Sequence, residues 1–229
     1  MLFLGVIGGC GLGVAAWGQE VAPGKLEWEA RWGEERLELG VPYRLGQDTV
    51  VWEEVRLYVQ GCHWGEGEAT GGAVHLYDAA EPEKGRVPCP GKPGSGGVAF
   101  LLGVDSATSV AGVMPGDLDP VHGMYWTWQS GYIFMKLEGR CTRSAERDGR
   151  FYWHVGGFEG KHAAQRWVKL PVEEHGTRAE AQWVVAMDLR VMAEAVDWTT
   201  CRRVMSPGEK AAALADAGQG MFTLESRVP

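Results

Sequence analysis

The feature that most constrains the fold is a period-two alternation of apolar and polar residues in several short stretches. The stretch KLEWEARWGEERLELG from Lys25 places Leu26, Trp28, Ala30 and Trp32 on one side and charged residues on the other. Successive strand residues point to opposite faces, so this pattern predicts a strand that is buried on one side. In TVVWEEVRLYVQG, Val55, Leu57 and Val59 share a face in the same way. The chain is therefore expected to build sheets.

Further short strands follow along the chain. They are predicted in GGAVHLYD, VAFLLGVD, AQRWVKLPV and the beginning of AEAQWVVAMDLRVMAEAV, through Asp188, and YIFMKLEG is expected to pair with RFYWHVGGF as a hairpin. The segment EPEKGRVPCPGKPGSGG from Glu81 is dense in Pro and Gly and is predicted to be a loop. The totals of 34 Gly and 11 Pro also favour many short strands over long helices.

A single helix is expected near the C-terminus. SPGEKAAALADAGQGMF has Ser206 as the N-cap, Pro207 at the first helical position and a run of alanines behind them. No repeat or interdomain linker is evident. The predicted fold class is all-β: an antiparallel β-sandwich with one short C-terminal helix, forming a single domain over residues 25–229.

The N-terminal residues resemble an export leader. Residues 1–19 carry no charge and form an apolar, small-residue run, which predicts a signal or lipoprotein leader. VIGGC would place a lipid anchor on Cys10, and a buried N-terminal strand is the alternative to both. The run is too short and glycine-rich for a membrane span, which needs roughly 20 apolar residues. A periplasmic, secreted or cell-surface location is expected.

Charge and cysteine content limit the partners and the redox state. A formal charge of −8 argues against a nucleic-acid partner, because binding phosphates needs clustered Lys and Arg. Beyond Cys10 there remain Cys62, Cys89, Cys141 and Cys201, an even number that is typical of disulfides in exported chains. Three pairings exist, and sequence order favours Cys62–Cys89 with Cys141–Cys201.

Two of the six histidines interrupt apolar strands: His75 in AVHLYD and His154 in FYWHVGG. A hydrogen-bonded, half-buried imidazole is the plain interpretation of each. Strands from distant parts of a sequence can converge, however, and neutral imidazole suits copper, zinc, iron or nickel. The interpretation adopted is a metal site that uses both rings, with Glu138 and Asp78 as acceptors that orient them. Met124 and Met135 could add thioether ligands or only pack.

No catalytic pattern is found, so the chain is predicted not to be an enzyme. Ser106 lacks the GxSxG elbow, and HExxH is absent. The adjacent acids Glu53 and Glu54 point to opposite faces of a strand and cannot act as a facing acid/base pair.

The stretch DPVHGMYWTWQSGYIFMKLEG from Asp119 is the most aromatic part of the chain. Alternation places Trp126 and Trp128 on one face, where they are expected to form a dry wall near the histidines. The alternative is a carbohydrate- or surface-binding module that presents these rings to solvent, as the total of 11 tryptophans would allow.

Several of these blocks, in this order, carry a family resemblance. EVRLYVQG, HLYDAAEP, the stretch from GVDSATS to MYWTWQSGYIFMKLEG, FYWHVGG and VMSPGEKAAALADAGQGMF resemble the MbnP-like family of bacterial periplasmic copper-binding proteins, from about Leu26 to Phe222. The resemblance implies an exported β-sandwich that works beside a di-haem cytochrome c peroxidase-like partner. It also implies copper held by two histidines, which correspond to His75 and His154.

In such relatives the partner oxidises a tryptophan near the copper to kynurenine. Here Ala73 and Val74 stand directly before His75, and the nearest upstream tryptophan is Trp64, the candidate for oxidation. A domain whose metal site has decayed is the third hypothesis.

Overall fold

The computed structural model describes residues 24–68, 71–144, 146–172 and 182–227. The predicted leader, residues 1–19, lies outside these residues, as does Cys10.

The described residues form two β-sheets. The smaller sheet contains five strands, in the order β14 (Phe222–Arg227), β12 (Gln182–Asp188), β1 (Gly24–Trp32) and β2 (Glu35–Arg36), with β6 (Arg86–Cys89) also paired to β1. The larger sheet contains nine strands, in the order β11 (Arg166–Leu170), β7 (Val98–Leu102), β4 (Asp48–Trp64), β9 (Gly131–Cys141), β10 (Arg150–Gly156) and β13 (Arg203–Val204). Three more strands join it: β3 (Pro42–Leu45) and β5 (Val74–Asp78) pair with β4, and β8 (Tyr125–Thr127) pairs with β9.

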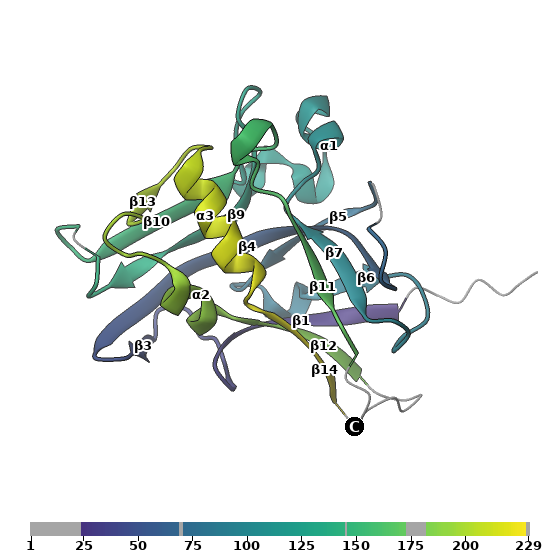
Figure 1. Cartoon of the computed structure of the whole chain (residues 1–229), viewed down its shortest axis with the longest axis horizontal. Helices are drawn as coiled ribbons and strands as arrows, with labels where there is room; N and C mark the ends of the chain where they lie inside the picture. Colours follow the sequence, from purple (N-terminus) through teal and green to yellow (C-terminus); the bar gives the residue numbers. More distant parts are fainter. Residues whose placement is uncertain (1–23, 69–70, 145, 173–181, 228–229) are drawn as a thin grey trace, which may run out of the picture.

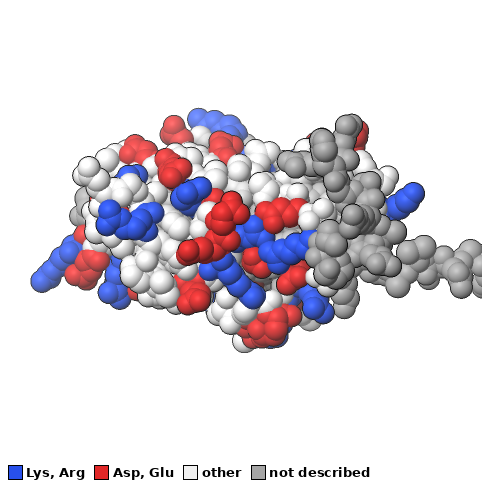
Figure 2. Space-filling view, turned by 90° about the horizontal axis from the view of Figure 1, so that it is seen from below, with Lys and Arg blue, Asp and Glu red and all other residues white. Residues whose placement is uncertain are grey.

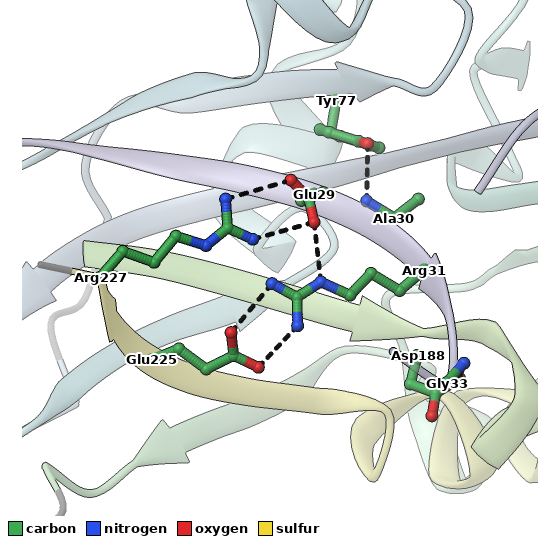
Figure 3. Close-up of polar contacts among 8 residues, drawn as sticks. All are labelled: Glu29, Ala30, Arg31, Gly33, Tyr77, Asp188, Glu225 and Arg227. Atoms are coloured by element: carbon green, nitrogen blue, oxygen red, sulfur yellow. Dashed lines mark hydrogen bonds and ion pairs between the residues drawn. The ribbon is translucent and has the colours of Figure 1, made fainter. Parts of the chain in front are cut away.

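The sheets meet through large apolar side chains. Trp28 of β1 contacts Phe100 of β7 with ring centroids 4.8 Å apart, and Phe222 of β14 packs against the same two rings. The apolar positions predicted from the alternation, in β1 and in β4, are buried in this core. A hydrogen bond also joins the two sheets: the backbone N–H of Ala30 in β1 donates to the hydroxyl of Tyr77 on β5 over 3.0 Å (Figure 3).

The prediction of a mostly β chain is confirmed, but the purely antiparallel arrangement is wrong. β1 and β12 run parallel, with Glu27 opposite Val184, and β10 and β13 also run parallel. Parallel partners cannot be joined by a tight turn, so local turn signals carry no information about these two pairs. The β9–β10 hairpin is confirmed as antiparallel.

The described residues contain three α-helices instead of one: α1 (Ser106–Ala111), α2 (Leu189–Ala195) and α3 (Glu209–Gln219). Four 3-10 turns accompany them: η1 (Pro82–Lys84), η2 (Gly116–Leu118), η3 (Pro120–His122) and η4 (Gly160–His162). α3 lies across β10 and β11 (Figure 1). It begins two residues later than predicted, after Gly208, and Pro207 lies close to Gly157 instead of opening the helix.

The segment from Glu81 is also more ordered than its composition predicts. Arg86–Cys89 form β6, whose Val87 pairs with Leu26 of β1. Pro88 is compatible with this strand, because β6 pairs with β1 on one side and proline is tolerated in strands mainly at sheet edges.

The outer face of the five-stranded sheet carries a cluster of four charges: Glu29, Arg31, Glu225 and Arg227 (Figure 3). Arg31 donates to Glu29 over 2.7 Å and makes a two-pronged contact with Glu225 at 2.7 and 2.9 Å. Arg227 closes the cluster by donating to Glu29 over 3.1 Å. These long side chains cross β12 and cover it, which explains why Ala186 and Val184 between them are buried.

Figure 2 views the molecule from below, on the side where this sheet lies in Figure 1. Acidic and basic side chains alternate over the visible part of that face, and neither sign forms a large patch.

Candidate functional site

His154 lies in the middle of β10, and its side chain is only 9% exposed. Its Nε2 is 2.6 Å from Oε1 of Glu138 on the neighbouring strand β9. Glu138 was predicted to orient an imidazole, and it stands in the right place to do so. A carboxylate partner fixes both the ring orientation and the position of the ring proton.

His154 belongs to a line of charges that crosses four strands. We call the charged strip the set of side chains Asp78, Arg56, Glu54, Lys136, Glu138 and His154. In register, His154 stands opposite Lys136, Lys136 opposite Arg56, and Arg56 opposite Asp78. Glu54 Oε1 lies 2.9 Å from both Arg56 and Lys136, and Arg56 donates to Asp78 over 2.7 Å.

The charged strip also reaches the loop that follows α1. Nη1 of Arg56 donates to the backbone carbonyl of His122 in η3 over 3.1 Å. The strip therefore connects β10, which carries His154, through β9 and β4 to the η2–η3 segment.

His75 lies in β5, the strand that carries Asp78 at the other end of the charged strip. Of the His75 side chain, 24% is exposed. Its Nδ1 is 3.6 Å from Oδ2 of Asp117 in η2, which also accepts the backbone N–H of Leu76 over 3.1 Å. The His75 ring is the main reason that the pKa of Asp117 lies below its ordinary value; burial opposes this shift, and the Leu76 N–H adds to it.

The predicted acceptor for His75 was wrong. Asp78 is bound to Arg56, and its second oxygen accepts the N–H of Ala80. Residues 75 and 78 are three positions apart, so their side chains leave β5 on opposite faces. Asp117 takes the predicted role, and no local pattern could identify it, because it lies in a proline- and glycine-rich loop far along the chain.

The structure does not bring the two histidines into a single ligand set. β4 and β9 lie between β5 and β10, and His75 points away from the sheet face that carries the charged strip. Neighbouring strands are about 4.8 Å apart, so the backbones are separated by about 14 Å across the sheet. Within the described residues, no group of three or more His, Cys, Asp or Glu side chains is arranged to hold a metal ion.

Each ring nevertheless has the chemistry of a metal ligand. One nitrogen of each faces a carboxylate, and no hydrogen bond is found for the other nitrogen among the residues that the structure describes. Metal-binding histidines usually show this division, because the carboxylate holds the proton on the distal nitrogen and leaves the other lone pair for the ion.

Trp64 lies away from His75. His75 stands opposite Val59, and Trp64 follows five positions later on β4, roughly 16 Å along the strand. Its ring packs against Trp183 of the five-stranded sheet at 5.1 Å. The oxidation of Trp64 stays a prediction that this packing does not favour.

The two tryptophans of the aromatic stretch do not form a common wall. β8 ends at Thr127, so Trp128 lies in the turn to β9 and is 78% exposed. Trp126 is half buried and lies close to the backbone at Gly156. The prediction that both rings line the core was wrong for Trp128, because strand alternation stops at the turn.

The methionines named as candidate ligands are buried. Met124 is fully buried, and the thioether of Met135 lies against Gly218 of α3. Both therefore fill the core, the use that is commonest for methionine. No helix in the described residues has the length and hydrophobicity needed to cross a membrane.

Comparisons with known proteins agree with the resemblance found in the sequence. The family model MbnP matches residues 21–206. The solved structure of MbnP from Methylosinus trichosporium is similar in fold, with a TM-score of 0.56 and 17% sequence identity, and the match covers 90% of this chain and 99% of that one. No curated protein matches the chain. The match to the family model over most of the length shows that the chain belongs to the MbnP family.

Proposed function

We propose that this protein is an exported copper-binding protein of the methanobactin-related type, and that His75 and His154 supply its imidazole ligands. Membership of the MbnP family supports the proposal. A periplasmic or cell-surface location and a di-haem cytochrome c peroxidase-like partner belong to the same proposal.

The observation that carries the proposal is the paired environment of the two rings. His154 faces Glu138 and His75 faces Asp117, each through one nitrogen. Imidazole with one free lone pair suits copper among the transition metals. In the described part of the chain, His63 shows the contrast: its nitrogens lie 2.8 and 3.0 Å from the carbonyls of Gly61 and Gly67, so neither is free.

A copper ion that binds both rings would require β5 to leave its place beside β4, because β4 and β9 lie between β5 and β10 in the sheet. Two separate ions would each need further ligands, for which water and the nearby carboxylates are the candidates. The stoichiometry of binding distinguishes these arrangements, and the identity of the ligands is tested independently of it.

The test is copper binding by single variants. Loss of an outer acceptor typically weakens metal binding by about 10–100-fold, so His75→Ala and His154→Ala are each expected to weaken it at least as much. Glu138→Gln should give a smaller loss. Competition titrations with a chromophoric copper chelator measure these affinities.

His63→Ala serves as the matched control and should bind copper like the parent. If His75→Ala and His154→Ala both retain the parent's affinity, the proposal is wrong. If the parent binds one equivalent of copper and either single substitution removes it, the two histidines share one ion. If each substitution removes half of the bound copper, the protein has two sites.

A second candidate function, glycan or surface binding, is favoured by the exposure of Trp128. An exposed indole face can stack on a sugar ring. If this is the function, Trp128→Ala should abolish retention on a panel of immobilised polysaccharides, whereas Trp126→Ala should change it less because Trp126 is half buried. Equal retention of the parent and Trp128→Ala would exclude Trp128 as a sugar-binding residue.

A further inference from the structure

Cys62 and Cys89 meet at the junction of the two sheets. Cys62 lies near the end of β4 in the nine-stranded sheet, and Cys89 is the last residue of β6 in the five-stranded sheet. Their Sγ atoms are 2.8 Å apart, which is closer than two non-bonded sulfur atoms normally approach. The side chains are buried, with Cys62 5% exposed and Cys89 0% exposed.

The backbone around the two cysteines holds them in this position. The N–H of Trp64 donates to the carbonyl of Pro90 over 2.8 Å, two residues beyond Cys62 and one beyond Cys89. On its other side, Cys89 stands in register with Gly24 of β1. The contact between the sulfur atoms is therefore built into the pairing of both chain segments and does not depend on a flexible loop.

We propose that Cys62 and Cys89 form a disulfide bond in the mature protein, which joins the two sheets covalently. The bond closes the loop from Cys62 to Cys89, and this loop contains the whole of β5 with His75 and Tyr77. Formation of this bond does not require copper.

The bond forms by exchange with an oxidised small-molecule or protein disulfide. One cysteine thiolate attacks the oxidant disulfide and releases one of its thiols; the second cysteine thiolate then attacks the mixed disulfide and releases the other. Two protons pass from the cysteines to the two released thiols, so the protein is oxidised by two electrons and the oxidant is reduced by two.

The folded arrangement determines when this exchange takes place. The contact with Cys89, and to a smaller extent burial, raise the pKa of Cys62. The thiolate that must attack is therefore scarce once the two sheets have packed together. Exchange is therefore expected before the sheets close on one another. After closure, the same burial shields the bond from reductants.

Cys141 and Cys201 differ from this pair. All four cysteines are buried free thiols in the structure, but among the described residues only Cys62 and Cys89 have their sulfur atoms in contact; Cys141 Sγ instead accepts the N–H of Arg143. The pairing predicted from sequence order is supported by sulfur geometry for Cys62–Cys89 only.

The test is a disulfide map of the full chain. Protein refolded with oxidised and reduced glutathione is denatured, alkylated without reduction, digested and analysed by mass spectrometry. We expect one linked peptide pair containing Cys62 and Cys89, and alkylated Cys141 and Cys201. Alkylation of both Cys62 and Cys89, or a link from either to another cysteine, would overturn the proposal.

Thermal unfolding provides a second measurement that does not depend on digestion. Reductant should lower the melting temperature of the parent and of the Cys141→Ser/Cys201→Ser control by several degrees when it is present throughout refolding. The Cys62→Ala/Cys89→Ala variant should be insensitive to it. An equal effect of reductant on all three proteins would contradict the proposal.

Discussion

Replacing Trp153 by alanine is expected to lower the free energy of unfolding by about 4 kcal/mol, within the range measured for deletion of buried tryptophan side chains. Trp153 is fully buried on β10 and forms the centre of an aromatic cluster. Its ring lies 4.6 Å from Phe151, 4.8 Å from Trp198 and 5.9 Å from Trp52. Its indole N–H also donates to the carbonyl of Cys201, so the substitution leaves a cavity and an unpaired buried oxygen.

Urea unfolding followed by circular dichroism measures this loss. Trp128→Ala is the control, because its exposed ring should change the free energy of unfolding by less than about 0.5 kcal/mol. If the two variants unfold at the same urea concentration, the aromatic cluster does not stabilise the domain as the structure indicates.

Arg31→Ala is expected to cost about 3 kcal/mol, at the lower end of the range for breaking a buried ion pair. The Arg31 side chain is 7% exposed and neutralises both Glu29 and Glu225. Without it, the one cation left beside Glu29 among the described residues is Arg227, whose side chain is 42% exposed. The cost stays at the lower end of that range because Glu225 is 39% exposed and can be solvated in the variant.

The same substitution should change the dependence of stability on pH. Burial would raise the pKa of Glu29, but hydrogen bonds from Arg227 and Arg31 outweigh it and hold the pKa below 4.5, the ordinary value for a glutamate. A carboxyl whose pKa is lower in the folded state contributes stability above its unfolded pKa, and this contribution is lost as the pH falls toward the folded pKa. The parent should therefore lose stability below about pH 4.5, and Arg31→Ala should lose less over the same range.

Arg36→Ala provides the matched control for both measurements. Arg36 stands opposite Arg31 in register but is exposed, so its removal should change the free energy of unfolding by less than about 0.5 kcal/mol. Urea midpoints of the three proteins at several pH values give both quantities. A parent and an Arg31→Ala variant with parallel pH profiles would show that the Glu29–Arg31 contact does not contribute.

The strands were predictable where local periodicity decides burial. β1, the central part of β4 and the β9–β10 hairpin follow the alternation, because each packs one face on the core. The same rule fails for Glu29 and Arg31, which alternation places in water. They pair with each other, but their other partners, Glu225 and Arg227, lie 194 and 198 residues away, so most of the neutralisation that permits their burial has no local signal.

The two histidines were identifiable because each interrupts an apolar strand, but their surroundings were only partly predictable. Glu138 is on the strand next to His154 in the predicted hairpin, so its contact follows from the sequence. Asp117 reaches His75 from the η2 turn, whose path over β5 depends on tertiary contacts. The separation of the two rings depends on strand order in a nine-stranded sheet, which alternation does not encode.

The parallel pairing of β1 with β12 has a consequence for folding. The first described strand obtains its central partner only when residues 182–188 are available, near the end of the chain. Long-range pairings of this kind form slowly, whereas hairpins such as β9–β10 can assemble early. Until β12 docks, the tryptophan-bearing face and one free edge of β1 are open to other chains. We therefore expect truncations that remove the C-terminal strands to aggregate through the N-terminal one.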